Sequence, residues 1–350
     1  MVIIVLITIL FISIITILCD GLSDSKSKIV FYFVGLLLIC VAGFRIGEKM
    51  PDYETYIGLY DQAISDNLTY FIEISFLYIA KISNNIKSES VIVLFFLYAV
   101  LGVSLKMISI KRLSGLWFYS LIIYVSNYFI LHEMIQIRAG VAAGFILLAI
   151  VPMYNRQFIK FFLLIGLATL FHYTSIIFLT LWLLKPNEYN KFLYIILILL
   201  AFVIHFIGLD IISFVLSPTP FYSIDPTSIS YLDINDQSSK INVFSIFVTT
   251  KVVFLIYFTY FINRIEKFNK YIFIILKLYA LGLFVYIAFS AYPVIAVRIS
   301  YTLMTCEIFI IPTLIFTIKG HYLPRLIVIS YALLAFTLNV YFTSYFNYHI

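Results

Sequence analysis

Long apolar runs recur along the whole sequence, and they set the class of fold. Runs of about 17 to 21 residues, close to the length that an α-helix needs to cross a bilayer, follow one another from end to end. The composition agrees, because 63% of the residues are hydrophobic and only 11% are charged. We therefore predict an all-α polytopic integral membrane protein, with residues 1–350 forming a single transmembrane domain.

Polar breaks divide the chain into apolar segments, one of which is too short to cross. Residues 70–82 contain Glu73 and Lys81 and would reach only about 20 Å as a helix, against a hydrocarbon core of about 30 Å. We predict a short re-entrant or interfacial helix there, and about 12 transmembrane helices elsewhere. The predicted spans are residues 2–19, 29–44, 90–108, 116–131, 138–153, 158–171, 173–184, 191–208, 242–262, 271–290, 302–318 and 326–344.

The distribution of charge predicts the orientation. Lys and Arg concentrate in the cytoplasmic loops of membrane proteins, and six basic groups hold 14 of the 23 cations. Placing them inside puts residues 45–89, a turn at 132–137, an outer loop near 209–241 and a turn at 291–300 outside, with both termini. This predicts a multi-pass protein of the bacterial inner (cytoplasmic) membrane, in contact with lipids and not with nucleic acid. The basic groups are Lys26/Lys28, Lys106/Lys111/Arg112, Arg156/Lys160, Lys185/Lys191, Arg264/Lys267/Lys270 and Lys319/Arg325.

The apolar run at 158–184 has a polar FHYTS sequence at its centre. One long helix would carry Lys185 and Lys191 to the outside, so two short crossings that meet at His172 agree better with the charge rule. We expect a hairpin with a submerged bend. Irregular backbone at depth needs protein or a water-filled cavity to satisfy it. A hydrogen-bonded core histidine remains the alternative for His172.

Three arginines fall near the outer leaflet, where the charge rule does not predict cations. Arg45 ends the second span, Arg138 begins a span rich in glycine and alanine, and Arg298 begins the next-to-last span. Small residues bring helices close together, which places Arg138 against protein. The alternatives are a snorkelling anchor for Arg45, and for Arg138 an interface anchor or a partner for Glu133.

These arginines and His172 come from four distant regions and are expected at one side of the membrane. Arginine has a planar fork of donors that suits phosphate and diphosphate, and a neutral histidine can take a proton from a hydroxyl. Such a set suits a lipid-linked phosphate substrate that reacts at the outer face. The sequence has no phosphate-binding loop, no dinucleotide fingerprint and no HExxH, so we predict no cofactor and no metal.

Four short motifs stand out along the chain: FRIGEKMPDYETYIGLYD at 44–61, QIRAGVAAGFILLA at 136–149, LFHYTSIIFL at 170–179 and VRISYTLMTCEIFIIP at 297–312. In this order they resemble the EpsG/Wzy-like family of bacterial polysaccharide polymerases, and the resemblance runs through most of the chain. It implies a metal-independent glycosyltransferase that uses a polyprenyl-diphosphate-linked oligosaccharide donor and a lipid-linked repeat unit as acceptor, in O-antigen or exopolysaccharide biosynthesis. A chain-length regulator protein is a candidate partner.

The resemblance extends to individual residues. Arg45 and Asp52 match the family's Arg and Asp-Tyr region, Arg138 its Gln-x-Arg region, His172 its Phe-His motif and Arg298 its late arginine. Pro51 stands where a glycine-rich approach to the aspartate is common.

The resemblance implies a separate role for each of these residues. Arg138 and Arg298 clamp the donor diphosphate, with Arg45 as an additional substrate-binding residue. His172 acts as the base, and Asp52 orients a sugar or the histidine. The tyrosines expected to contact sugars are Tyr53, Tyr56, Tyr222 and Tyr231.

Three alternatives of other kinds remain open. A flippase for lipid-linked oligosaccharide, or another polysaccharide transporter, would share the hydrophobicity and the buried cations, and Lys251 and Lys277 favour it. We find no internal repeat of the kind that transporters carry. A membrane O-acyltransferase would explain the histidine but not several outer arginines. A ligase that transfers lipid-linked glycan would use the same donor.

Overall fold

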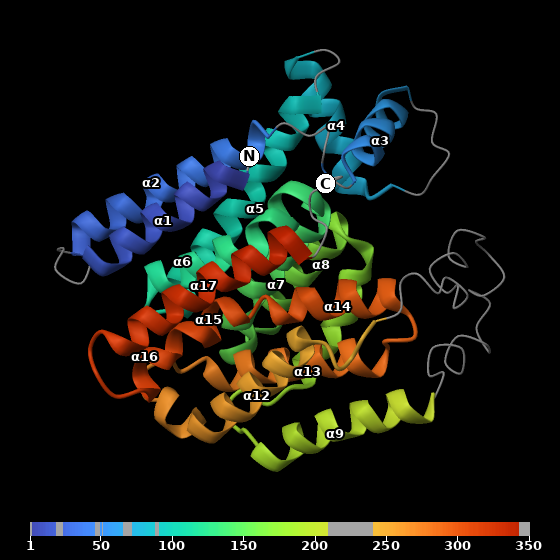
Figure 1. Cartoon of the computed structure of the whole chain (residues 1–350). Coiled ribbons are helices and arrows are strands. Elements are labelled where there is room, and N and C mark those ends of the chain that lie inside the picture. The colour runs from blue at the N-terminus through green and yellow to red at the C-terminus, as the bar shows by residue number, and fades with distance from the viewer. Residues whose placement is uncertain are drawn as a thin grey trace. The chain divides into compact units, whose positions relative to one another are not determined.

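The computed structural model describes residues 2–18, 24–45, 50, 52–65, 72–87, 91–208 and 241–342. These residues form helices, and this part of the chain has no strand (Figure 1). The predicted all-α polytopic fold is confirmed. Helical contacts divide the chain into two compact units, residues 1–186 with 307–350 and residues 187–306. The single-domain organisation expected from the sequence stays a prediction.

The first unit holds most of the helices, and its centre is the α6–η2–α7 region, which packs against α5 and α8. In the second unit, α13 packs against α9, α12 and α14. The helices of the first unit are α1 (Val2–Leu18), α2 (Asp24–Gly43), α3 (Tyr53–Ser65), α4 (Ile74–Ile86), α5 (Val91–Leu113), α6 (Trp117–Tyr124), the π-helix η2 (Val125–Ile135), α7 (Ile137–Tyr154), α8 (Phe158–Phe171), the 3₁₀-helix η3 (Tyr173–Leu183), α15 (Glu307–Ile310), η6 (Ile311–Thr313), α16 (Leu314–Thr317) and α17 (Leu323–Phe342). Those of the second unit are α9 (Lys191–Ile207), α12 (Ile246–Ile265), α13 (Ile272–Ala288) and α14 (Pro293–Met304).

The described residues contain seven helices that are long and apolar enough to cross a membrane by length and composition. Five further apolar helices are shorter, with 10–17 residues. Each of the predicted spans overlaps one of these helices, so the chain is a multi-pass membrane protein. The number of crossings, about 12, stays a prediction, because helices such as α8 do not reach the length of an upright span.

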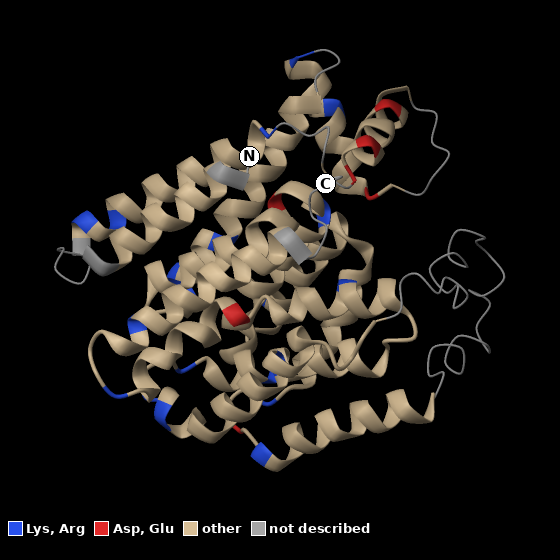
Figure 2. Cartoon of the chain, viewed as in Figure 1, with Lys and Arg blue, Asp and Glu red and all other residues tan. Residues whose placement is uncertain are grey.

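The region between the second and third predicted spans contains two short helices. The helix expected near 70–82 is present as α4, shifted to Ile74–Ile86, and is not long enough to be a span. The helix α3 was not predicted. Its buried residues nevertheless follow the i, i+3, i+4, i+7 spacing of one helical face, at Tyr56, Leu59, Tyr60 and Ala63. Figure 2 shows acidic residues on the other parts of α3.

The α6–η2 segment corrects two predictions. Residues 117–135 are one continuous helical segment, so the turn expected at 132–137 is reduced to Gln136. His132 and Glu133 are buried inside η2 instead of lying in an outer turn. Lys106 was expected in a cytoplasmic loop, but it lies fully buried within α5, and only Lys111 and Arg112 occupy the basic end of that helix.

The turn expected at 291–300 is also shorter than predicted. Pro293 is the first residue of α14, a position where proline's missing N–H costs nothing because no helical partner would accept it. Arg298 therefore lies within the helix, where it is half-buried, and its carbonyl accepts a hydrogen bond from Thr302 Oγ1 at 2.8 Å. The predicted outer loop, 209–241, lies outside the described residues apart from Ile241.

The two arms of the hairpin predicted at 158–184 are present as α8 and η3, which pack together, while the submerged position of the bend stays a prediction. The guanidinium of Arg156, before α8, donates to the carbonyl oxygens of Trp182 at 2.8 Å and Leu184 at 2.6 Å, which joins the two open ends. The 3₁₀ geometry of η3 explains how arms of unequal residue number match. Eleven residues at about 2.0 Å each reach about 22 Å, close to the roughly 21 Å of the 14-residue α8.

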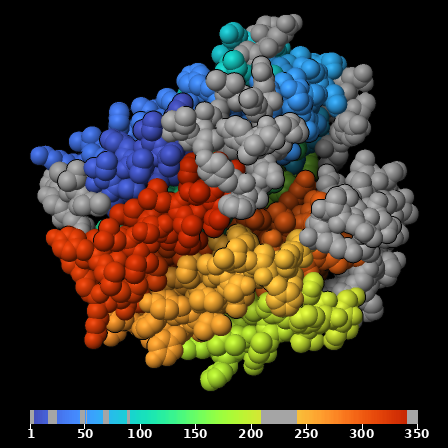
Figure 3. Space-filling view, in the orientation of Figure 1, coloured from blue at the N-terminus to red at the C-terminus, as the bar shows by residue number. Residues whose placement is uncertain are grey.

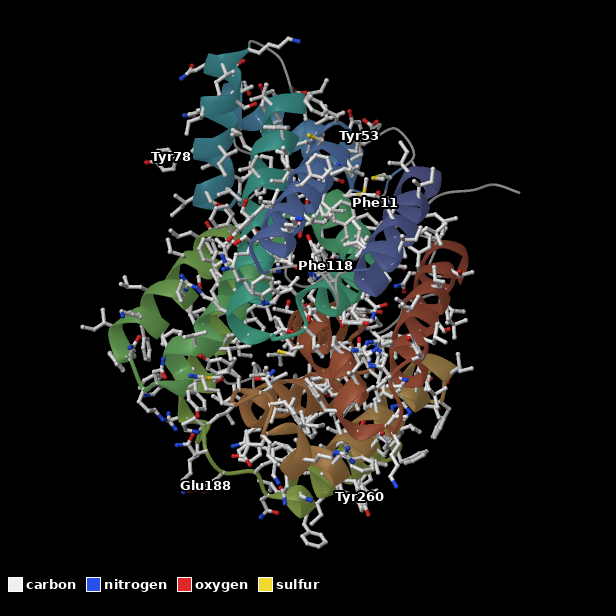
Figure 4. The ribbon with its side chains drawn as sticks, turned by 90° about the vertical axis from the view of Figure 1, so that its left-hand side faces the viewer. Phe11, Tyr53, Tyr78, Phe118, Glu188 and Tyr260 are labelled. Atoms are coloured by element: carbon white, nitrogen blue, oxygen red, sulfur yellow. The ribbon has the colours of Figure 1, made fainter. Side chains whose placement is uncertain are left out.

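Many large apolar side chains face outward, as expected where lipid is the solvent. Exposed leucine, isoleucine and phenylalanine side chains occur on α1, α2, α8 and α9. Figure 3 shows α17 beside α1 in the first unit and α12 beside α9 in the second. Tyr78 on α4 and Tyr260 on α12 each project away from their unit (Figure 4).

Candidate active site around Glu73, Arg138 and His172

A carboxylate joins two of the residues singled out in the sequence. The guanidinium of Arg138, in the first turn of α7, donates to Oε2 of Glu73. The other oxygen of Glu73, Oε1, lies 3.5 Å from Nδ1 of His172. Glu73 is 93% buried by side chain, whereas Arg138 and His172 keep exposed fractions of 24% and 16%. The three residues form a partly open Arg–Glu–His cluster within the first unit.

The start of α4 positions Glu73. Its carbonyl accepts from Phe76 N at 2.9 Å and begins the helix, while its side chain takes no part in capping and is free to reach α7 and the hairpin bend. Two hydrogen bonds hold this segment against the hairpin. Ser75 Oγ donates to the carbonyl of Leu170 at 2.7 Å, and Tyr173 Oη donates to the carbonyl of Ile72 at 3.3 Å. These contacts bracket the Glu73–His172 pair on both sides.

His172 lies at the hairpin bend, in an extended conformation between α8 and η3. Its N–H donates to the carbonyl of Ala168 and its carbonyl accepts from Ser175 N, both at 2.9 Å, so the hairpin itself satisfies the bend's backbone. Its Nε2 is buried and has no hydrogen-bond partner within the described part of the chain. A proton on Nδ1, facing Glu73, leaves the lone pair of Nε2 available as a proton acceptor.

Aromatic rings surround Arg138. Its guanidinium lies 5.5 Å from the ring centroid of Tyr56 and 5.8 Å from that of Phe76. Tyr56 is buried on α3, and burial raises its pKa, so its hydroxyl stays neutral and is a hydrogen-bond partner for Arg138. Tyr56 and Phe76 are both buried, so their rings form the α3–α4 wall of the cluster.

Arg45 lies close to this cluster, after the end of α2. Its Nη1 donates to the carbonyl oxygens of Ala42 and Glu133, both at 3.2 Å, and its guanidinium carbon lies 3.9 Å from the ring centroid of Phe95. Its buried Nε has no partner among the described residues. Burial lowers the pKa of Arg45 to about 10, which still leaves the side chain cationic at neutral pH. Tyr56 is within electrostatic reach of both Arg45 and Arg138.

The ionisation of Glu73 gives a pH-dependence that can be measured. Burial alone would raise its pKa, but hydrogen bonding to His172 and the charge of Arg138 outweigh burial and lower it below the ordinary 4.5. A lowered folded pKa stabilises the protein above pH 4.5, and this contribution is lost as the pH falls through the folded value. We expect Glu73→Gln to cost about 1–3 kcal/mol at neutral pH and progressively less below pH 4.5.

Thermal unfolding of the detergent-solubilised protein from pH 7 to pH 3 measures this difference. A constant gap between wild type and Glu73→Gln across that range would contradict an ionised Glu73. Glu54→Gln is a matched control, because it removes another carboxylate from the exposed side of α3.

The other predicted site residues fall into three groups: residues of the first unit, a residue of the second unit, and residues outside the described part of the chain. Asp52 begins α3 in the left-handed region, with φ 64°, and its side chain is exposed. The carboxylate seen in contact with His172 is that of Glu73, and the orienting role expected of Asp52 stays a prediction. Tyr53 stacks on Phe95 with ring centroids 5.3 Å apart. Arg298 belongs to the second unit, and its place in the site stays a prediction, while Tyr222 and Tyr231 lie outside the described residues.

Glu73 is the site residue that the sequence analysis missed. It was noted only as evidence that residues 70–82 do not cross the membrane. The available signal was a carboxylate directly before a short apolar helix, in a chain with few acidic residues in apolar surroundings. Its partner also corrects an alternative, because Arg138 pairs with Glu73, whereas Glu133 pairs with Lys106.

The fold and the cluster define a multi-pass membrane protein with buried polar residues between its helices. The model of the EpsG family matches residues 28–350, and the chain belongs to this family. The chain is similar to the amylovoran biosynthesis protein AmsC of Erwinia amylovora, with 25% identity over 346 residues, which covers 92% of this chain and 88% of AmsC. No solved structure gives a significant match.

Proposed function

We propose that this protein is a polysaccharide polymerase. It transfers a glycan from a polyprenyl-diphosphate donor to a lipid-linked repeat unit at the outer face of the inner membrane, in O-antigen or exopolysaccharide biosynthesis. Membership of the EpsG family and the similarity to an amylovoran biosynthesis protein support the general role. The observation that carries the chemistry is the Arg138–Glu73–His172 cluster, in which Nε2 of His172 has no hydrogen-bond partner among the described residues.

The proposed step needs a base, and His172 supplies it. The acceptor hydroxyl oxygen forms the new bond to the anomeric carbon of the donor, and its proton moves to Nε2 of His172. Glu73 holds the Nδ1 side of the ring and stabilises the imidazolium that results, as the carboxylate of a catalytic triad does. Without Glu73, both the tautomer and the orientation of the ring would be lost.

The step also needs a stabilised leaving group. As the bond from the anomeric carbon to the diphosphate oxygen breaks, its electron pair stays on the polyprenyl diphosphate, and the developing charge must be neutralised. Arg138 shares its charge with Glu73, so Arg45, whose described hydrogen bonds go to carbonyl oxygens, is proposed to supply further positive charge. Arg298 is proposed as a third contributor from the second unit. No metal is required in this scheme.

The tyrosines complete the proposed site. Tyr53 and Tyr56, on the first turn of α3, offer ring faces and hydroxyls to the sugars, next to the exposed carboxylate of Asp52. Tyr222 and Tyr231 are proposed to reach the repeat unit from the 209–241 region.

A clean deletion strain tests the proposal. We expect loss of the polysaccharide ladder, with a single repeat unit left on the acceptor lipid or surface, and full restoration by the wild-type gene. Loss of even the single unit would assign the protein to a flippase or a ligase step instead. A normal ladder with altered acetylation would assign it to acyl transfer, and either result would overturn the polymerase.

A further inference from the structure

A completely buried ion pair lies in the first unit, outside the Arg–Glu–His cluster. Lys106 of α5 and Glu133 of η2 approach to 2.5 Å between Nζ and Oε1, and their side chains are 0% and 1% exposed. Tyr124 Oη donates to the same carboxylate oxygen at 2.9 Å. Burying two charges costs free energy that a well-packed apolar pair would not, so the pair calls for an explanation beyond stability.

The pair connects to the segments that carry two proposed diphosphate ligands. Glu133 lies near the end of η2, where the last carbonyl groups of a helix lack helical partners. The carbonyl of Glu133 accepts instead from Arg45 Nη1 at 3.2 Å. Lys106 Nζ donates to the carbonyl of Gly140 at 2.6 Å, two residues beyond Arg138 in α7. Each member of the ion pair therefore makes one of these contacts. Glu133 holds Arg45 through its carbonyl, and Lys106 holds the turn of α7 that presents Arg138.

Two glycines make these approaches tight. A Cβ atom at Gly102 would lie 1.9 Å from Oε2 of Glu133, and one at Gly140 would lie 2.0 Å from the carbonyl oxygen of His132. At Gly140 the obstacle is backbone, so α7 comes this close to η2 only because the residue is glycine, whereas a side chain at Gly102 would have to displace the carboxylate of Glu133. The ion pair thus occupies a site shaped to hold it in one geometry.

We propose that Lys106 and Glu133 are positioning residues that fix Arg45 and Arg138 as a two-arginine clamp for the donor diphosphate. This inference rests on the proposed function. Lys106 holds the first turn of α7 through Gly140, and Glu133 holds Arg45 through its carbonyl, so the ion pair sets the spacing of the two cations. Because binding a diphosphate between two cations depends on their spacing, loss of the pair weakens donor binding without removing either arginine.

The test compares binding of undecaprenyl diphosphate to the purified full chain in detergent. Lys106→Met with Glu133→Gln removes both charges while keeping similar side-chain lengths, and avoids leaving one charge unpaired. We expect affinity to fall about tenfold, with the melting temperature close to that of wild type. Lys111→Met makes the same substitution five residues further along α5, at an exposed position, and is expected to bind as wild type does.

A double-mutant cycle with Arg45→Gln separates positioning from a general structural effect. If the pair acts through Arg45, the combined loss of affinity is clearly smaller than the product of the separate losses. Losses that multiply, or unchanged affinity in the charge-free pair, would overturn the inference while leaving the polymerase intact. If the double variant does not fold, Glu133→Asp, which keeps the charge but withdraws the carboxylate by one methylene, enters the same cycle with the same criterion.

Failure of the proposed function gives a different pattern. In that case wild type does not bind undecaprenyl diphosphate, or Arg45→Gln and Arg138→Ala bind it as tightly as wild type. That result would overturn both the donor assignment and the positioning role.

Discussion

Replacing His172 with alanine is expected to slow chain extension by about 10²–10⁴-fold, the usual contribution of a general base. The variant should reach the membrane at the wild-type level, because the backbone groups of the bend are satisfied by Ala168 and Ser175 and need no side chain. The measurement is the product ladder formed by purified protein from a polyprenyl-diphosphate-linked repeat unit. The same variant in the deletion strain should leave single repeat units.

His205→Ala is the matched control for this prediction. His205 is also half-buried near a helix end, but it lies on α9 of the second unit, and its Nδ1 is 2.7 Å from Ser290 Oγ. We expect it to keep the wild-type ladder. Wild-type extension by His172→Ala would exclude the histidine as the base and would leave its Glu73 contact a structural one.

The second large effect is expected at Arg138. Arg138→Ala removes a fork of donors that is proposed to contact the leaving group, and a loss of about 10²–10³-fold in transfer is expected from the removal of one such stabilising contact. Arg138→Lys keeps the charge but not the planar fork, so it should recover stability more than transfer. Measuring the membrane level of each variant, and then ladder formation at matched protein amounts, distinguishes an effect on stability from an effect on transfer.

The Glu73 contact complicates Arg138→Ala, because the substitution leaves a buried carboxylate without its cation. The double variant Arg138→Ala with Glu73→Gln removes that penalty. We expect the double variant to return to wild-type membrane levels and to remain inactive. Arg112→Ala, at the exposed end of α5, controls for the loss of any arginine. Recovery of transfer in the double variant would contradict a direct role for Arg138.

Local residue patterns were enough for many elements of the fold. The apolar runs predicted each span segment that the helices now occupy, and the charge rule predicted a hairpin around His172. The residue patterns gave a wrong prediction where polar residues lie inside a helix and not in a loop. His132 and Glu133 suggested a turn, but η2 continues through them because Lys106 and Tyr124 satisfy the carboxylate inside the unit. The i, i+3, i+4, i+7 stripe of α3 was present in the sequence and was obscured by its acidic residues.

The candidate site also contains residues that the sequence could identify and residues that it could not. Arg45, Arg138 and His172 could be selected from sequence because cations and a histidine in apolar surroundings are expensive and need a reason. Their partners could not be selected, since pairing depends on which helices meet. Glu73 lies 65 residues from Arg138 in the sequence, so no local pattern reveals the contact. The close approach at Gly102 and Gly140 is likewise a property of packed helices.

The sequence by itself determined the class of protein, because apolar length and loop charge depend only on the order of residues and on the bilayer as solvent. It also determined which polar side chains carry a cost that function must explain. Only the tertiary structure decided that Glu73 joins Arg138 to His172, and that Lys106 pairs with Glu133, whose carbonyl accepts a hydrogen bond from Arg45. Those contacts follow from the packing of α4, α5, η2 and α7, and a buried charge is stabilised by the partner that packing brings within a few ångströms.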